Sequence, residues 1–397
     1  MNLLRITTRI YPDKSGPAKQ AFLLSNYLSK KGHKVINLAC NPYKYRIKER
    51  RINQNFKIYY LPLTAPGINA NIIRLILFFI QFYILALIKS FQIIRKENIN
   101  IVHSHSPAPS GFISYFIKKI YNIPYIYTIH GIEKIFKIIH ILDFIISVNH
   151  SEKCIVVSKQ LKEHLSGNFN LNNLVWIPNG IDINDYHHVK NKEKKKDIIK
   201  LLNLRHFLDK NDIIISYIGY MFFKQKVKGM IDFLEAFERS ITKLDENVKK
   251  RIKLLFIGEG EFSPYLKNHI INLKMEKNVL FLGYRKEIPS FLAISDLLAL
   301  TSYLEGGPNV ILEAMASRVP CLGSNVGDIP LMIKDTGFIV EPGDTEQISK
   351  YLLEFYNLSE NQKSDLRSAA FQRVKELFSN RSIGMKFIKV YQNILTK

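Results

Sequence analysis

Residues 301–320 read TSYLEGGPNVILEAMASRVP and carry the strongest fold signal in the chain. The apolar residues before Thr301 predict a strand, and Pro308 predicts the start of a helix, because proline is well tolerated at the first helical position. Glu305 lies in the loop between these two elements, and Glu313 lies on the helix. A strand, a glycine-containing loop and a helix in this order are typical of a parallel, doubly wound sheet.

The same stretch has the chemistry of a sugar-nucleotide site. Backbone N–H groups of Asn309 and Val310 at a helix N-terminus attract phosphate oxygens, and Gly307 lets a ligand approach the backbone closely. Glu313 can accept hydrogen bonds from a ribose diol, although it could instead be a first-turn acid favoured by the helix dipole. Glu305 can bind sugar hydroxyls or stabilise positive charge at an anomeric carbon.

The rest of the second half alternates short apolar runs with runs of helical periodicity. Gly219 follows the first of these apolar runs, where a ligand can approach the end of the strand. Glu259 lies between two glycines and could contact a nucleoside or be a solvated loop acid. We expect strands at residues 212–218, 253–257, 279–282 and 297–301 and helices at residues 229–242 and 288–295.

The first half begins with the same alternation of elements. We expect strands at residues 3–10, 34–39, 101–103, 125–129 and 154–157, and a helix at residues 18–31. Gly16 lies in the loop before that helix, and His103, His105 and His130 lie at or just after the ends of strands, where ligands of open parallel sheets gather. His130 could act in the site or only bond to backbone, and for the other two histidines both alternatives stay open. Asn179 and Gly180 predict a turn.

A chain of 397 residues exceeds what one hydrophobic core usually organises, so we expect two domains. We place the first at residues 1–185 and the second at 201–380, both of the α/β class with Rossmann-like sheets. The charged run KNKEKKKD lies in a linker at residues 186–200. Residues 381–397 predict a C-terminal helix that can pack back on the first domain.

Residues 72–88 are apolar on nearly all sides. This pattern fits a core helix or a helix partly inserted in a membrane surface. The uninterrupted apolar run is shorter than the roughly 20 residues that a spanning helix needs. We expect a core helix of the first domain and keep the membrane alternative open.

The formal net charge of +23 suits nucleic acid, an anionic membrane surface or phosphorylated small molecules. Lys and Arg residues are scattered rather than clustered with aromatic residues, so we expect no nucleic-acid binding. Cys40, Cys154 and Cys321 lie far apart without C-x-x-C spacing, which predicts neither disulfides nor a zinc site. The N-terminus lacks a signal-peptide pattern, so we expect a cytoplasmic protein.

The segment EGGPNVILEAMA resembles the E-x7-E signature of the retaining GT-B glycosyltransferases of group 1, family 4. Other segments resemble this family in the same order along nearly the whole chain, namely KSGPAKQAFLLSNYLSKKGHKV, IVHSHSP, YTIHG, WIPNGID, LLFIGEGE and PCLGSNVGDIPLMI. The resemblance implies two Rossmann-like domains facing a central cleft. It also implies transfer of a hexose from a nucleoside diphosphate sugar to an acceptor hydroxyl, with retention at the anomeric carbon.

The resemblance also assigns roles to residues. Glu305 would contact the donor sugar, Glu313 the ribose and Lys228 the leaving diphosphate. Gly16 would let its loop close over the phosphates, and His130 would lie beside the reacting centre. The sequence has no D-x-D motif, so we expect no metal and no cofactor beyond the nucleotide-sugar co-substrate. We favour a UDP-sugar donor and a lipid-linked or polysaccharide acceptor at the inner face of the plasma membrane, whose anionic surface the chain would bind.

One departure from the family pattern leaves alternatives open. Tyr220 follows Gly219 where the family usually has an arginine, and Lys224 or Lys226 could supply the missing cation. A catalytically silent partner that binds sugar nucleotide is one alternative function. A sugar-nucleotide epimerase or hydrolase of the same architecture is another.

Overall fold

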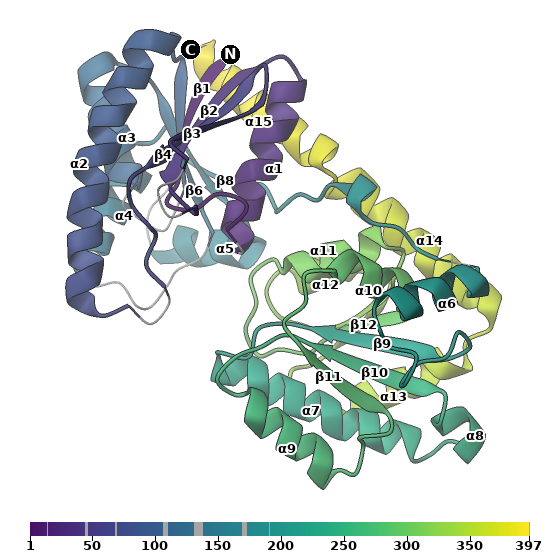
Figure 1. Cartoon of the computed structure of the whole chain (residues 1–397). Helices are drawn as coiled ribbons and strands as arrows, with labels where there is room; N and C mark the ends of the chain where they lie inside the picture. The colour runs from purple at the N-terminus through teal and green to yellow at the C-terminus, as the bar shows by residue number, and fades with distance from the viewer. Residues whose placement is uncertain are drawn as a thin grey trace. The chain divides into compact units, whose positions relative to one another are not determined.

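A computed structural model describes residues 1–13, 15–43, 47–67, 70–105, 110–130, 138–168, 173–189 and 191–396. The chain forms two compact units (Figure 1). Unit 1 contains Met1–Gly180 and Asn380–Lys397, and unit 2 contains Ile181–Ser379. The chain therefore leaves unit 1 once and returns to it with its last helix.

Unit 1 is built on an eight-stranded sheet of order β3-β4-β2-β1-β5-β6-β7-β8. The strands are β1 (Asn2–Ile6), β2 (Lys34–Cys40), β3 (Glu49–Asn53), β4 (Phe56–Leu61), β5 (Ile101–His105), β6 (Tyr125–Ile129), β7 (Lys153–Val156) and β8 (Leu174–Trp176). All pairings are parallel except that of β3 with β4. Strand order reverses at β1, which pairs with β2 on one side and β5 on the other.

Helices cover both faces of this sheet, because alternate residues of each strand point to opposite faces. The helices are α1 (Gly16–Lys30), α2 (Ile72–Glu97), α3 (Ser110–Tyr121), α4 (Ile138–His150), α5 (Lys159–Asn168) and α15 (Asn380–Leu395). Leu4 and Ile6 of β1 join the core beneath α2, α3 and α4, whereas Leu3 joins the core beneath α1 and α15 (Figure 1).

Unit 2 is built on a six-stranded, fully parallel sheet of order β11-β10-β9-β12-β13-β14. The strands are β9 (Ile213–Ile218), β10 (Ile252–Ile257), β11 (Val279–Gly283), β12 (Leu297–Leu300), β13 (Cys321–Ser324) and β14 (Phe338–Val340). This is the 3-2-1-4-5-6 order of a Rossmann fold, and it reverses between β9 and β12.

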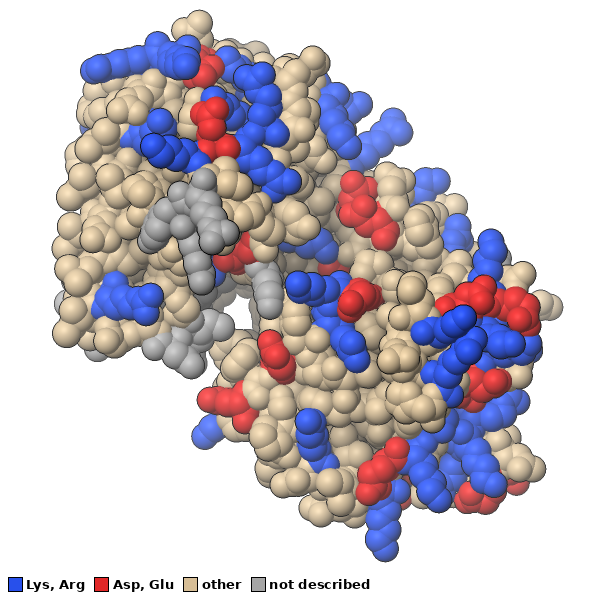
Figure 2. All heavy atoms as spheres, viewed as in Figure 1, with Lys and Arg blue, Asp and Glu red and all other residues tan. Residues whose placement is uncertain are grey.

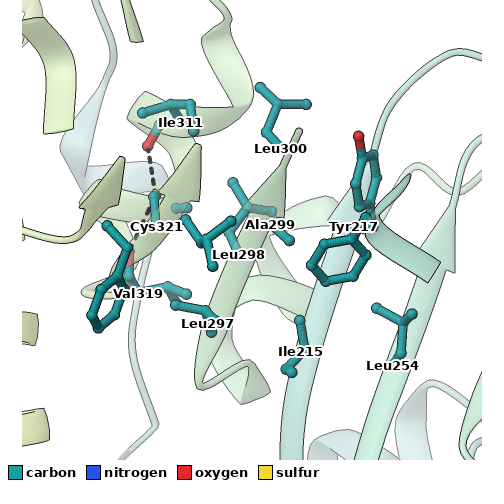
Figure 3. Close-up of a cluster of buried hydrophobic side chains, with 14 of the residues drawn as sticks. Ile215, Tyr217, Leu254, Leu297, Leu298, Ala299, Leu300, Ile311, Val319 and Cys321 are labelled. Atoms are coloured by element: carbon teal, nitrogen blue, oxygen red, sulfur yellow. Dashed lines mark hydrogen bonds between the residues drawn. The ribbon is translucent and has the colours of Figure 1, made fainter. Parts of the chain in front are cut away.

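The helices of unit 2 also pack on both faces of its sheet. They are α6 (Lys192–Leu201), α7 (Lys224–Ile241), α8 (Glu246–Lys249), α9 (Ser263–Asn272), α10 (Ile288–Ile294), α11 (Asn309–Ala316), α12 (Ile329–Ile333), α13 (Thr345–Asn357) and α14 (Glu360–Leu377), with a 3-10 turn at Ile183–Asp185. Figure 3 shows the centre of the core, where Tyr217 lies among Ile215, Leu254 and Ala299. The thiol of Cys321 donates to the carbonyls of Ile311 and Val319 (Figure 3). Burial raises the pKa of this thiol, so it stays protonated and acts as a core side chain.

The observed elements correct four sequence predictions. The first strand ends at Ile6 rather than at residue 10. The helix predicted at residues 72–88 continues to Glu97. The helix predicted at residues 229–242 begins at Lys224, so Lys228 lies inside it and not in the preceding loop. The linker predicted at residues 186–200 is instead part of unit 2, apart from residue 190, which lies outside the described residues.

The reason for the last difference is a buried lysine in the charged run. Lys195 of α6 is 9% exposed, and its Nζ donates to the Asp212 carbonyl at 2.8 Å and faces Asp296 Oδ2 at 3.4 Å. Ile199 of the same helix joins the core under β9 and β10. A run that looks fully solvated in sequence thus carries a paired charge and an apolar residue on its inner side.

Candidate functional site

The site predicted in unit 2 lies at the carboxyl ends of its central strands. Ligands of open α/β sheets bind in the crevice where strand order reverses, and here that point lies between β9 and β12. Gly219 directly follows β9, and Thr301 directly follows β12. The Tyr217 hydroxyl donates to the Thr301 carbonyl at 2.6 Å and joins the two strands at their carboxyl ends.

Glu305 is the best-defined acid of this site. It lies between β12 and α11, and its side chain is 8% exposed. Ser302 Oγ donates to its Oε1 at 3.1 Å, and Lys226 Nζ lies 2.9 Å from the same oxygen. Lys226 comes from the first turn of α7, so one cation and one hydroxyl hold the carboxylate in a single position.

The loop that carries Glu305 is braced from β13. Gly327 has a φ of +57°, and a Cβ there would lie 2.4 Å from the carbonyl oxygens of Glu305 and Gly306. The backbone N–H of Asp328 donates to the Gly306 carbonyl at 2.7 Å. A glycine is therefore required where the β13–α12 turn approaches this loop.

The two lysines of α7 have different neighbours. Lys228 Nζ lies 4.3 Å from the centroid of the Tyr303 ring, and the Tyr303 hydroxyl donates to Asp232 Oδ2 at 2.8 Å. Gly229 packs directly on the end of β12, since a Cβ there would lie 2.1 Å from the Thr301 carbonyl oxygen. The structure thus brings Lys226 to Glu305 and Lys228 to Tyr303.

The remaining unit 2 residues predicted from sequence surround the same edge of the sheet. Asn309 and Val310 are the first two residues of α11, and Glu313 is half-buried on this helix. Gly219 belongs to the turn after β9, which contacts the turn after β10, because a Cβ on Gly258 would lie 1.9 Å from the Gly219 carbonyl oxygen.

Unit 1 has a small cavity next to the point where its own strand order reverses. The volume is about 30 Å³. Its polar lining comes from β1, α1, β5, β6 and the residue after it, the segment after β8, and the start of α15, namely Arg5, Gln20, His105, Thr128, His130, Asn179 and Asn380. The Gln20 side chain exchanges hydrogen bonds of 2.8 and 2.9 Å with the backbone of Gly180, which fixes the predicted turn beside the cavity.

Arg5, His105 and His130 form a hydrogen-bonded chain along one side of this cavity. Arg5 Nη2 lies 2.6 Å from His105 Nε2, and His105 Nδ1 lies 3.2 Å from His130 Nε2. A guanidinium can only donate, so His105 Nε2 is an acceptor and a neutral His105 carries its hydrogen on Nδ1. His130 Nε2 must then accept, and His130 carries its own hydrogen on Nδ1.

Burial keeps these histidines neutral. Desolvation, with a smaller effect of Arg5, lowers the pKa of His130 to about 4. The pKa of His105 lies well below its ordinary value for the same reasons, with His103 as a further cause. Burial lowers the pKa of Arg5 itself to about 10, so the guanidinium stays charged at neutral pH. His130 is therefore a neutral imidazole in this chain.

His103 contributes to the packing of unit 1 rather than to the cavity. Its ring is fully buried, with Nδ1 2.7 Å from Tyr391 Oη and Nε2 2.7 Å from Thr128 Oγ1. It therefore ties β5 and β6 to α15, whereas His105 lines the cavity. Sequence reasoning missed Arg5, whose sequence signal was a single charged residue inside an apolar strand.

One further predicted residue can be placed in unit 1. Gly16 is the first residue of α1, which follows β1 after a short loop, so it lies at the carboxyl edge of the unit 1 sheet. Among the residues that the structure describes, no group of three or more His, Cys, Asp or Glu side chains is placed to hold a metal ion.

Known families match both halves of the chain. Residues 14–185 match the sequence model of Glycosyltransferase Family 4, and residues 194–373 match that of Glycosyl transferases group 1. The chain belongs to the group 1, family 4 glycosyltransferases. The sequence prediction of the family is confirmed.

Individual proteins that resemble this glycosyltransferase support the family assignment and the fold. The chain is 27% identical to the N-acetyl-alpha-D-glucosaminyl L-malate synthase of Bacillus anthracis over 99% of this chain and 97% of that protein. It is 26% identical to the UDP-Gal:alpha-D-GlcNAc-diphosphoundecaprenol alpha-1,3-galactosyltransferase of Escherichia coli, over 68% of this chain and 69% of that protein. The sucrose-phosphate synthase of Thermosynechococcus elongatus superimposes with a TM-score of 0.79 at 17% identity, over 100% and 99% of the two chains. The predicted GT-B class, with two Rossmann-like domains, is confirmed as the fold.

Proposed function

We propose that this glycosyltransferase moves a hexose from a UDP-sugar to a hydroxyl of a lipid-linked or polysaccharide acceptor, with retention at the anomeric carbon. The observation that carries the proposal is the buried Glu305 carboxylate, paired with Lys226 and preceding the N-terminus of α11. The Escherichia coli relative supports the donor and acceptor classes, because its name states a UDP-galactose donor and a diphosphoundecaprenol-linked acceptor.

In this proposal unit 2 binds the donor. The first backbone N–H groups of α11, at Asn309 and Val310, bind phosphate oxygens, and Gly219 and Gly307 allow close approach. Glu313 accepts hydrogen bonds from the ribose. Lys226 and Lys228 neutralise the charge that grows on the leaving diphosphate, so that no metal ion is needed.

Glu305 acts on the sugar in this proposal. A carboxylate that is 8% exposed stabilises positive charge at the anomeric carbon more strongly than a solvated one would. Ser302 and Lys226 limit its motion, so the geometry is set before the sugar arrives.

Unit 1 binds the acceptor and contributes His130. Its neutral ring cannot act as a general acid near pH 7, because burial holds its pKa at about 4. In this proposal the uncharged imidazole of His130 lies beside the sugar, and Gly16 leaves room for the donor phosphates. We place the reaction in cell-surface glycan synthesis at the cytoplasmic face of the membrane.

The experiment is NMR spectroscopy of the purified chain with UDP-glucose, UDP-galactose and UDP-N-acetylglucosamine, in EDTA, recorded before the released sugar mutarotates. Even without an acceptor, slow hydrolysis should release the α-anomer first, and Glu305→Gln should lower the rate by about 100-fold or more. Glu376→Gln removes an exposed acid from α14 and serves as control. Release of the β-anomer first, or an absolute need for a divalent metal, would contradict the proposal.

Two other results would indicate the alternative functions. A chain that binds the nucleotide but never turns a donor over, with acceptor lipids present, would be the silent partner. Conversion of one UDP-sugar into another without release of UDP would identify an epimerase.

A further inference from the structure

The outer face of α2 carries a continuous apolar stripe. Seven large aliphatic side chains are between 37% and 67% exposed on this helix, namely Ile72, Ile73, Ile76, Leu77, Ile80, Ile84 and Ile88. From Ile73 the stripe follows helical spacing through Leu77, Ile80 and Ile84 to Ile88, so these side chains share one face. Such a contiguous patch is unusual on a soluble monomer and marks an interaction surface.

The opposite face of α2 is fixed in the core of unit 1. Phe78, Phe79, Phe82, Ala86 and Ile93 are buried against the sheet. The helix is long and apolar enough to cross a bilayer by length and composition, but only 22% of its most apolar window is buried in the structure. A helix held along one side by its own sheet can lie on a surface while the fold stays intact.

Two neighbouring helices extend the apolar patch. Phe116 and Ile120 of α3 and Leu142 and Ile145 of α4 are between 37% and 58% exposed. The buried Asp143 of α4 joins all three helices, since its Oδ1 accepts from the Tyr83 hydroxyl of α2 at 3.0 Å and from the Phe112 backbone N–H of α3 at 2.7 Å. The patch is therefore a rigid surface of three packed helices.

The exposed charges on the described residues of these three helices are cationic. Among the described residues of α2, α3 and α4, the acids are Glu97 and Asp143. Glu97 is paired with Lys34 at 2.6 Å, and Asp143 is 1% exposed. Figure 2 shows a largely uncharged flank of unit 1 over α2, with Lys and Arg side chains toward its two ends. The exposed basic residues of the three helices are Arg74, Arg95, Lys96 and Lys119.

We propose that the α2–α3–α4 face docks on an anionic lipid bilayer, with the aliphatic side chains among the acyl chains and the basic residues at the headgroups. An apolar stripe with basic flanks, and without an exposed acid among the described residues of its three helices, is the pattern of helices that lie in the bilayer interface. A second copy of the chain fits less well, because a symmetric pair would bring like charges together across the contact. The docking is independent of the donor chemistry proposed above.

The experiment is co-sedimentation of the full chain with vesicles of phosphatidylcholine, with and without phosphatidylglycerol. We expect binding to the vesicles that contain phosphatidylglycerol. The triple variant Leu77→Ser, Ile80→Ser, Ile84→Ser should lower the partition coefficient at least about tenfold. A matched triple variant, Leu201→Ser, Ile271→Ser, Leu377→Ser, removes three exposed helical residues of unit 2 and should bind like the unmodified chain.

Two further measurements separate the lipid from other partners. Arg95→Gln with Lys96→Gln should weaken binding to phosphatidylglycerol vesicles several-fold and leave binding to phosphatidylcholine unchanged. Melting curves of all variants check that the fold is intact. The proposal would be overturned if the unmodified chain failed to bind phosphatidylglycerol vesicles, or if the stripe variant bound equally well. A dimer in sedimentation velocity that the stripe variant abolishes, without vesicle binding, would assign the face to a second copy.

Discussion

At the scale of single residues, the sequence names Lys226 as one of two candidate cations near Glu305 but does not distinguish it from Lys224. From the sequence, Lys224 and Lys226 are equal alternatives for the missing cation, because both are expected in the loop before a helix at residues 229–242. The structure starts α7 at Lys224, and this helical phase brings Lys226 within 2.9 Å of Glu305.

This geometry predicts different effects for the two lysines. Lys226→Met should lower kcat/KM for sugar transfer by about tenfold or more, because Glu305 loses the cation that holds it. Lys224→Met should change kcat/KM by less than about twofold, since an exposed lysine contributes little. Steady-state kinetics with the donor identified by NMR measures both, and equal losses in the two variants would refute the assignment.

The Arg5 to His105 to His130 chain gives a second prediction at this scale. Nitrogen-15 NMR of the imidazole groups should find His130 as the Nδ1–H tautomer at pH 7, with a pKa near 4. Arg5→Met removes one cause of the depressed pKa, so the pKa of His130 should rise while burial keeps it below its ordinary value. Arg51→Met, which removes an exposed arginine from β3, should leave it unchanged. Observation of the Nε2–H tautomer would disprove the hydrogen-bond order.

At the scale of elements, the turns at the carboxyl ends of the strands depend on close contacts between backbone segments as well as on side chains. Gly327 shows this, because its φ of +57° and its contacts with the carbonyls of Glu305 and Gly306 both exclude a side chain. Gly327→Ala should destabilise unit 2 by roughly 1–3 kcal/mol and also lower transfer, since the Glu305 loop must move. Gly167→Ala has open space around the new methyl group and is the control. Unchanged transfer in Gly327→Ala would mean that this brace does not position Glu305.

Asp143 provides a pH test of the three-helix layer. Burial raises its pKa to about 6, above the unfolded value of about 4, so the folded state binds this proton more tightly. Stability from this group is therefore present below about pH 4 and is lost as pH rises through about 6. Asp143→Asn keeps an oxygen acceptor for Tyr83 and Phe112.

We expect Asp143→Asn to stabilise the chain at pH 7.5 by roughly 1–3 kcal/mol and to have little effect at pH 4. Chemical denaturation at both pH values, followed by circular dichroism, measures the difference. If Asp143→Asn lowered the free energy of unfolding at pH 7.5 as much as at pH 4, or more, the expectation would be wrong. The hydrogen bonds from Tyr83 and Phe112 would then stabilise the carboxylate enough to offset its burial.

At the scale of the whole molecule, the sequence predicted the alternation of strands and helices and the family, but not which helices are half-exposed. Residues 72–88 look like a core helix because nearly every residue is apolar, and periodicity cannot reveal a buried side when both sides are hydrophobic. Residues 186–200 look like a linker because one buried lysine and one isoleucine are hidden among exposed charges. Both differences arise from tertiary packing, on which local composition carries no information.

The proposed function requires that the unit 2 edge around Glu305 and α11 binds a nucleoside diphosphate sugar. The most direct measurement is a thermal shift of the purified chain with UDP, GDP and ADP, with Glu313→Ala alongside, because a ligand that binds only the folded chain raises its melting temperature. We expect UDP to raise the melting temperature and the variant to lose this shift. No shift with any nucleotide, or an equal shift in Glu313→Ala, would mean that this edge is not the donor site.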